Sequence, residues 1–469
     1  MKHSSSSDIP ASSGSRDMRL FRLTWPIFLE MLLFLLMGSV DLFMLSRVSD
    51  NAVSAVGASN HIITIAILVL EVIGNGAAIV LSQYIGARQH YEAARIAAVA
   101  VALNAIVGLF LSLAFLAGSG RMLTAMNLQG DILEYADAYL VIVGGGIVLQ
   151  ALINIMAAIV RTYGFTKETM LVSLGMNLIH VALNYALIFG HWGFPELGVQ
   201  GAAISTVASR FVCLVVFIGL MYRVMEVRIA FGHYFEFPKA YVRKILKIGL
   251  PSAFEQIMYQ CCQLVFVFYT TFLGATALAA KQYASNMSMY IYLFSAAVGM
   301  GTAIVTGRLV GAERHGDAYR RVWSSVRWAL AITVLIDALV IAFRVPLFGL
   351  FTDDPDIVRL GAQVLLLSIV LETGRTCNMV IINSLRAAGD ATFPVYMGVL
   401  SMVCMSLPLG YWLVFRLDLG LVGIWLAIAA DEWLRAVIMF FRWRSRAWAN
   451  KGLVDRGGAQ EPASAATST

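Results

Sequence analysis

Long apolar stretches separated by short polar segments run along most of the chain. An α-helix needs about 20 consecutive apolar residues to cross the hydrocarbon core of a bilayer. Stretches that satisfy this requirement lie near residues 23–46, 55–84, 95–117, 132–160, 168–189, 199–222, 246–272, 277–307, 322–343, 357–385, 393–415 and 420–441. The pattern predicts an all-α integral membrane protein with twelve transmembrane helices.

The apolar pattern occurs twice. With a constant offset of 225 residues and no gap, Pro26 matches Pro251 and Glu30 matches Glu255. Over residues 74–95, ten of twenty-two positions are identical to their counterparts in the second copy. We infer an internal duplication that gives two homologous six-helix bundles. Each copy has an even number of helices, so the two copies have the same orientation in the membrane.

The domain organisation follows from the duplication and from the polar stretches around it. We expect five parts: a disordered N-terminal tail, the first bundle, a cytoplasmic linker, the second bundle and a disordered C-terminal tail. Their predicted bounds are 1–18, 19–224, 225–244, 245–443 and 444–469.

Composition supports the membrane assignment. Charged residues make up 13% of the chain and hydrophobic residues 59%, with a mean hydropathy of +0.77, whereas about 25% of residues are charged in soluble domains. Assigning the loops alternately to the two sides places 25 of the 34 Lys and Arg on the side of the N-terminus and 5 on the other. By the positive-inside rule both termini are cytoplasmic. The net charge of +6 therefore reports topology, and no nucleic-acid partner is expected.

Motifs of the common enzyme classes are missing from the sequence. It contains no HExxH, GxSxG or GxxxxGK[ST], so a metalloprotease, an elbow hydrolase or a self-contained ATPase is not supported. The five cysteines fall in apolar segments without metal-like spacing and are interpreted as small buried side chains. We expect neither an enzyme nor a bound metal or cofactor.

Asp41 is the first candidate for function. At about 1.5 Å rise per residue, it lies roughly 20 Å beyond Pro26, in the outer half of the membrane. A carboxylate inside an apolar helix is unfavourable unless it faces a cavity or a partner, and the second copy has Phe266 at this position. The alternative is an interfacial Asp near the helix end.

The fifth apolar stretch carries three polar residues on one face. Asn177, His180 and Asn184 are spaced i, i+3 and i+7, which places them in one stripe of a helix. Such a stripe indicates a lined cavity, with interhelical hydrogen bonding as the alternative. In the fourth stretch, Tyr139 and Asn154 are further polar candidates.

The second copy has its own charged residues within apolar stretches. They are Glu255, Lys281, Asp337, Glu372 and Arg375. Glu372 and Arg375 are spaced i, i+3, so they either pair with each other or face a substrate.

Several motifs together resemble a known family. They are PxxxE followed by VDLFML and AVSAVG, the GAxRHGDAYR turn after the eighth helix, SLRAAGDATFP after the tenth, and LGVQGAA and LGLVGIW before the sixth and twelfth. As a set they are similar to the multidrug and toxic compound extrusion (MATE) family of antiporters, within the MOP superfamily. The resemblance covers about residues 20–443.

The resemblance implies a mechanism. It predicts two bundles that face each other in a V and alternate between inward-open and outward-open states. The protein would export cationic or amphipathic small molecules in exchange for H⁺ or, as a less favoured choice, Na⁺. It would act as a monomer in the lipid bilayer of the bacterial cytoplasmic membrane. A lipid or oligosaccharide flippase of the same superfamily is the alternative, and it would need a cavity lined with several Arg.

The resemblance also implies which residues couple the ion. By position, the cation-coupling set is Asp41, Tyr139, His180, Asn184 and Thr206, with His180 standing where Asn is usual.

In the sodium-coupled NorM-type branch, carboxylates also occur in the seventh and tenth helices. Those positions fall here on Tyr259 and Arg375, while Glu255 and Glu372 stand about one turn earlier. This departure favours H⁺ over Na⁺.

Overall fold

The computed structural model describes residues 20–227 and 229–454, and these residues contain helices and no strands. The first half holds the helices α1 (Leu20–Leu45), α2 (Asp50–Gly86), α3 (His90–Ala125), α4 (Gly130–Tyr139), η1 (Leu140–Gly144), α5 (Ile147–Thr162), α6 (Thr166–Ile188), η2 (His191–Gly193) and α7 (Gly198–Val224). The second half holds η3 (Phe231–Tyr234), α8 (Lys239–Thr271), α9 (Ala275–Gly311), α10 (His315–Ala342), α11 (Arg344–Gly349), α12 (Pro355–Leu366), α13 (Ser368–Ala387), α14 (Thr392–Ser401), η4 (Met402–Ser406), α15 (Leu407–Phe415) and α16 (Gly420–Arg444).

The predicted number of membrane-spanning helices agrees with these elements. Among the described residues, eight spans are long and apolar enough to cross a membrane, and two bent helix pairs raise the number to ten. The remaining two helices, α8 with 33 residues and α16 with 25, carry more charge and complete the twelve. The short helix α11 was not predicted.

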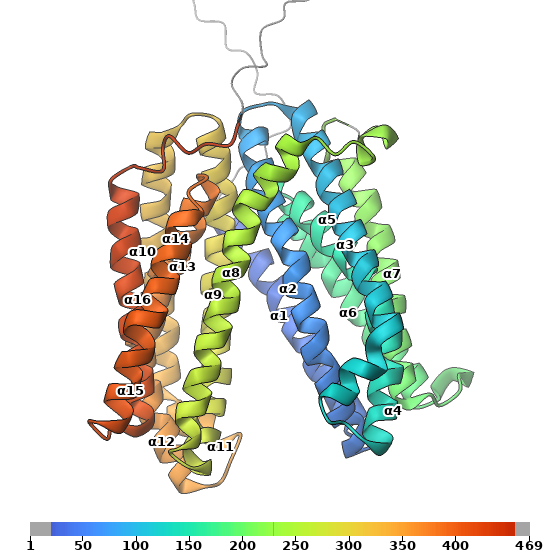
Figure 1. Ribbon diagram of the computed structural model, residues 1–469, viewed down its shortest axis with the longest axis vertical. Helices are drawn as coiled ribbons and strands as arrows, with labels where there is room; N and C mark the ends of the chain where they lie inside the picture. The colour runs from blue at the N-terminus through green and yellow to red at the C-terminus, as the bar shows by residue number, and fades with distance from the viewer. Residues whose placement is uncertain (1–19, 228, 455–469) are drawn as a thin grey trace, which may run out of the picture.

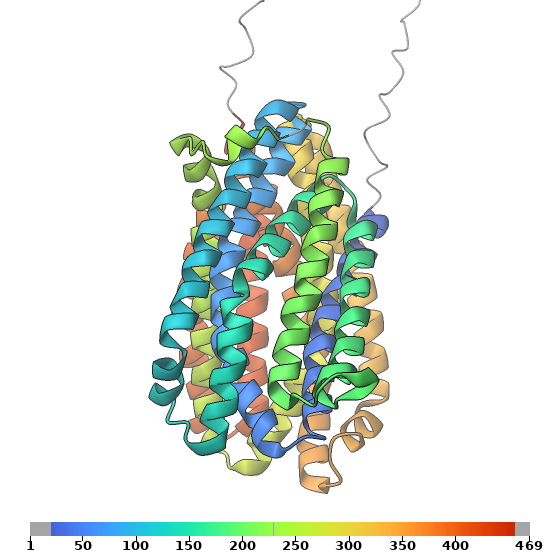
Figure 2. The ribbon, with the colours of Figure 1, turned by 90° about the vertical axis from the view of Figure 1, so that its right-hand side faces the viewer.

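The helices form two bundles, α1 to α7 and α8 to α16, that lie side by side (Figure 1). Within the first bundle the helices run along the long axis of the molecule (Figure 2). Figure 1 shows the bundles close together at the end where α2 and α9 finish, and farther apart at the opposite end. We call the first of these the closed end.

The duplication is visible in the bends of the helices. The pair α4–η1 and α5 is bent by 45°, and so is the pair α12 and α13. These pairs begin at 130 and 355 and end at 162 and 387, so the offset of 225 residues holds at both ends. A second π-helical turn, η4, lies between α14 and α15, whereas its counterpart α6 is continuous.

Glycines make the closed end tight. A Cβ on Gly86 of α2 would overlap the backbone carbonyl of Arg308 on α9, and a Cβ on Gly311 of α9 would overlap the backbone carbonyl of Gln83 on α2. The two contacts are the same contact made in both directions, because 83 and 308, like 86 and 311, differ by 225. Only a residue without a side chain lets the two backbones approach so closely.

Hydrogen bonds across the closed end follow the same symmetry. The Gln83 side chain donates to the carbonyl oxygen of Ala387 at the end of α13, at 2.6 Å. The Arg308 guanidinium donates to the carbonyl oxygen of Thr162 at the end of α5. Each bundle therefore uses the last turns of its second helix to hold the fourth spanning helix of the other bundle.

The prediction of a disordered tail over 444–469 is wrong for the residues up to 454. Within the C-terminal segment, which we define as residues 445–454, Trp448 is fully buried and stacks on Trp443 with ring centroids 4.1 Å apart. The ammonium of Lys451 lies 2.6 Å from Asp390. Leu453 is buried in the first bundle, and its N–H donates to Gln83 Oε1 at 2.7 Å.

The prediction failed because Trp448 and Leu453 are not part of a periodic apolar pattern, so the sequence does not indicate that they are buried. The rest of the predicted tail, like the N-terminal tail over 1–18, lies outside the described residues. The linker also differs from its predicted bounds of 225–244, because α8 already begins at Lys239.

Candidate functional site

The first bundle holds a buried polar site around Asp41. Asp41 lies on α1 with 5% of its surface exposed, and α6 places His180 and Asn184 opposite it, both with no exposed surface. The spacing of four residues between His180 and Asn184 puts them one turn apart on the same face of α6. An isolated buried carboxylate is strongly unfavourable, so its partners decide whether it can stay in this place.

Both residues of α6 contact the same carboxylate oxygen. His180 Nε2 lies 2.6 Å from Asp41 Oδ1, and the amide of Asn184 donates to the same oxygen at 2.6 Å. On the far side of the imidazole, the Ser209 hydroxyl lies 3.4 Å from His180 Nδ1. The carbonyl oxygen of Asn184 accepts from the Ser205 hydroxyl. A chain of hydrogen bonds thus joins α1, α6 and α7 through one carboxyl group.

Tyr139 and Thr206 complete the set that the resemblance implied. Tyr139, at the end of α4, is buried near Asp41 and near Thr206 of α7. Arg210, one turn beyond Thr206, is also buried, and its Nε and one terminal nitrogen have no hydrogen-bond partner. Arg210 was not part of the predicted coupling set. Its burial beside Tyr139 and Asp41 makes it part of this site.

Two other candidates of the first bundle stand apart from Asp41 in their contacts. The side chain of Asn177 donates to the backbone carbonyl of Ser173 on its own helix, at 2.8 Å. Asn154 accepts from Gln150, also within one helix, at 2.6 Å. Neither bond reaches another helix.

A carboxylate and an arginine pair at equivalent places in the two bundles. In the first bundle Glu30 lies 2.8 Å from Arg161, and in the second Glu255 lies 2.6 Å from Arg386. Both residues of the first pair are related to those of the second by the offset of 225. The sequence singled out Glu255 as a charged residue within an apolar stretch, a candidate for a substrate cavity, and gave no role to Glu30.

The second bundle contains a cluster of five buried charged residues on α13 and α16. Arg375 on α13 lies 2.8 Å from Glu372 and 3.6 Å from Glu432 on α16. Arg435, also on α16, lies 3.0 Å from Glu432 and 2.8 Å from Asp431. All five side chains are buried.

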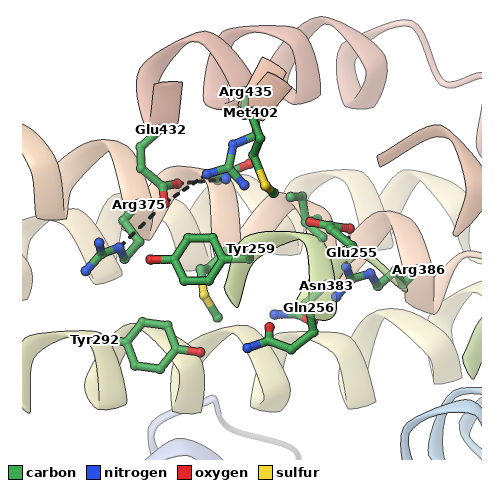
Figure 3. A pocket seen from close by; sticks show the side chains of 13 residues that line it. Glu255, Gln256, Tyr259, Tyr292, Arg375, Asn383, Arg386, Met402, Glu432 and Arg435 are labelled. Atoms are coloured by element: carbon green, nitrogen blue, oxygen red, sulfur yellow. Dashed lines mark hydrogen bonds and ion pairs between the residues drawn. The ribbon is translucent and has the colours of Figure 1, made fainter. Parts of the chain in front are cut away.

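A small pocket opens beside this cluster (Figure 3). Tyr259 of α8 and Tyr292 of α9 line it together with Arg375 and Glu432, and the Glu255 and Arg386 pair lies at its other end. Figure 3 shows the side chains of these residues converging on one space from different helices. The pocket therefore offers both acidic and basic groups to a ligand.

Glu372 and Arg375 were expected either to pair with each other or to face a substrate. They form an ion pair, and Arg375 also lines the pocket. Lys281 is buried on α9 and does not line the pocket. Sequence reasoning missed Asp431 and Glu432. The sequence does mark them, because DEWLR is a charged run within the apolar final helix, and charged residues inside a membrane helix are candidates for function.

Two duplicated helical bundles, each with ionisable groups buried among membrane-spanning helices, define a membrane transporter. The MatE family model matches residues 26–186 and 251–412, one segment in each bundle. The chain therefore belongs to the MatE family, which is a family of membrane transporters and not a class of enzymes.

Individual relatives agree with this assignment. The uncharacterized transporter YisQ of Bacillus subtilis is 42% identical over 440 residues, which cover 94% of this chain and 97% of YisQ. The probable multidrug resistance protein NorM of Thermotoga maritima is 28% identical, with 94% and 95% covered. A solved structure described as the outward-facing conformation of a multidrug resistance MATE family transporter has a TM-score of 0.84 at 21% identity, with 93% and 98% covered.

Proposed function

We propose that this transporter exports cationic or amphipathic organic compounds from a bacterial cell in exchange for protons, and that Asp41 is the coupling acid. The observation that carries the proposal is the buried carboxyl of Asp41, which accepts hydrogen bonds from His180 and Asn184 across two helices. The printed name of the NorM relative, a probable multidrug resistance protein, supports the class of substrate.

Proton binding at Asp41 changes what α1 and α6 can do for each other. As a carboxylate, Asp41 Oδ1 accepts from both His180 and Asn184. Once protonated, the group carries its own hydrogen and no charge, so the charge-assisted bonds become weaker neutral ones. Protonation also removes a negative charge that attracts a cationic compound, and the proton and the compound therefore compete for the first bundle. His180 Nε2 lies 2.6 Å from the carboxyl oxygen and is therefore placed to exchange a proton with it.

The conformation fits one half of an alternating-access cycle. Both bundles belong to one chain, which supports a monomer as the transporting unit in this proposal. The ends of α2 and α9, which meet at the closed end, lie on the side of the membrane to which most of the Lys and Arg are assigned. With the closed end in the cytoplasm, the bundles diverge toward the outside, and the conformation is outward-facing.

The buried charges favour cation export over the flippase alternative. An anionic head group needs arginines that are free to bind it. Arg375 and Arg435 are instead each within 3.0 Å of a carboxylate, which leaves Arg210 as the exception among the buried arginines of the described helices. One arginine beside Asp41 makes a poor site for an anion.

Ethidium efflux from proteoliposomes tests the proposal. We expect a proton gradient, acidic on the side that corresponds to the cell exterior, to drive efflux, and a sodium gradient alone to drive none. Asp41→Asn should abolish proton-driven efflux, because its amide cannot release or take up a proton. Asp50→Asn, at an exposed position in the first turn of α2, is the matched control and should transport normally. Full antiport by the Asp41→Asn protein, or efflux driven by sodium alone, would contradict the proposal.

A further inference from the structure

Asp337 is a buried acid without a partner. It lies on α10 with no exposed surface, and neither of its carboxylate oxygens makes a hydrogen bond. Every other carboxyl of the second-bundle cluster has at least one arginine within 3.0 Å. The function proposed above does not use Asp337.

The geometry of two neighbouring helices places Asp337 opposite Glu372. The hydroxyl groups of Thr333 on α10 and Thr376 on α13 lie 3.0 Å apart. The two helices are antiparallel, since α10 begins and α13 ends near Gln83 at the closed end.

Because the helices are antiparallel, a step of four residues forward on α10 and a step of four residues backward on α13 go in the same direction. The first step leads from Thr333 to Asp337, and the second leads from Thr376 to Glu372. The side chains at these positions lie on the same helix faces as the two threonines, so both carboxyl groups lie on the facing sides of α10 and α13, and the charge of Glu372 acts on Asp337.

The cluster contains more acids than bases. Asp337, Glu372, Asp431 and Glu432 supply four carboxyl groups, while Arg375 and Arg435 supply two guanidinium groups. The charged groups that act on Asp337 are Glu372 and Arg375, both from α13. Arg375 is already shared between Glu372 and Glu432. No cation is left for Asp337, and a bare carboxylate without water or a partner is strongly unfavourable.

We propose that Asp337 and Glu372 form a second proton-binding site, separate from Asp41, in which Asp337 holds a proton in this conformation. Glu372 Oε1 accepts from Arg375, and its other oxygen has no hydrogen-bond partner, so it is available to accept from the Asp337 hydroxyl. Release converts the Asp337 carboxylic acid into a carboxylate and passes the proton to water, once movement of α10 or α13 admits water to the pair. Each bundle then carries one proton-exchanging carboxyl group.

A proton fits this place better than a metal ion. No group of three or more His, Cys, Asp or Glu in the described residues is arranged to hold a metal. The guanidinium of Arg375, 2.8 Å from Glu372, would also repel a second cation at the same carboxylate. A proton does not need several ligands, and it converts the unpartnered carboxylate of Asp337 into a carboxylic acid that can donate a hydrogen bond.

Infrared spectroscopy of the protein in lipid nanodiscs at neutral pH tests the proposal without any substrate. A protonated carboxylic acid has a C=O stretch that carboxylates and amides lack. We expect this band in the wild type and in Asp41→Asn, and its loss in Asp337→Asn. Asp353→Asn, in an exposed loop, is the control and should keep the band. A band that persists unchanged in Asp337→Asn would overturn the proposal, and a band that appears only after sodium is removed would assign the site to sodium.

A second variant covers the case in which Asp337→Asn does not fold. Glu372→Gln replaces the acceptor that faces Asp337, so the frequency of the band should change while Arg375 keeps Glu432 as a partner. An unshifted band would contradict the pairing. Because Asp41→Asn retains the band if the second site exists, failure of this proposal is distinguishable from failure of the role proposed for Asp41.

Discussion

The two bundles share their scaffold and differ in the chemistry of their interiors. Glu30 and Arg161 in the first bundle recur as Glu255 and Arg386 in the second, with both ion pairs formed. Asp41, by contrast, has Phe266 as its counterpart, and Phe266 is fully buried in an apolar core. The duplicated ion pair therefore belongs to the architecture, whereas each bundle has buried ionisable groups of its own.

The closed end shows the same division. Its glycine contacts and cross-bundle hydrogen bonds are symmetric, yet the symmetric positions are filled by Gln83 and Arg308. Arginine only donates hydrogen bonds, whereas glutamine both donates and accepts. Gln83 can therefore also accept from Leu453 of the C-terminal segment. One chemical difference at a duplicated position creates a contact that exists on one side of the interface alone.

The largest expected effect tests the shared ion pairs. Glu30→Gln and Glu255→Gln each leave a largely buried arginine without its carboxylate, and each should lower the free energy of unfolding by roughly 3 kcal/mol. Thermal unfolding in detergent measures the loss. If the pairs are architectural, the two losses are similar, and adding Arg161→Met to Glu30→Gln recovers most of the first. A large loss of stability for one variant and none for the other would contradict a shared architectural role of the two ion pairs.

The glycine contacts give the next effect. Gly86→Ala and Gly311→Ala each insert a methyl group against backbone across the closed end, which should disfavour this conformation by roughly 1–3 kcal/mol. We expect both variants to slow ethidium efflux by similar factors. Gly38→Ala is the control, because nothing lies within 4 Å of its added carbon. Normal efflux by Gly311→Ala would show that the closed end forms without this close approach.

The smallest expected effect concerns His180, which contacts Asp41 in the interior of the first bundle. His180→Asn keeps a hydrogen-bond donor for Asp41 but removes the only imidazole that contacts it in the described residues. Efflux should continue within about tenfold of the wild-type rate, the equivalent of one hydrogen bond. The pH optimum of efflux should shift, because the group that contacts the coupling acid changes. An unchanged pH profile would remove the histidine from the proton pathway and leave the role of Asp41 intact.

The sequence predicted the parts of the molecule that have a local or repeated signal. Apolar length predicted the spanning helices, and the offset of 225 predicted the two bundles. The spacing of His180 and Asn184 on one helix face predicted two groups on the same side of α6. The family resemblance placed them in one coupling set with Asp41, and only the structure shows their contact with it, because no local pattern relates residues 139 and 143 positions apart.

What the sequence did not predict depends on contacts between distant residues. The pairing of Arg375 with Glu432 joins two helices with no spacing rule between them, whereas Glu372 at i, i+3 was the visible partner. The burial of Trp448 depends on a core to which α9, α10 and α13 contribute, more than 60 residues away in sequence for the nearest of them. Patterning reports which face of an element is apolar, and it does not report which element will cover that face.

The C-terminal segment also sets the order in which the protein can be completed during synthesis. The N–H of Leu453 bonds to Gln83 across 370 residues, so this contact cannot form until nearly the whole chain has left the ribosome. At roughly 5–20 residues per second, the second half takes on the order of 10–50 s to translate after α7 emerges. During that interval the first bundle stands in the membrane with its face toward the second bundle uncovered. The last residues to be made then join a helix that was among the first to be inserted.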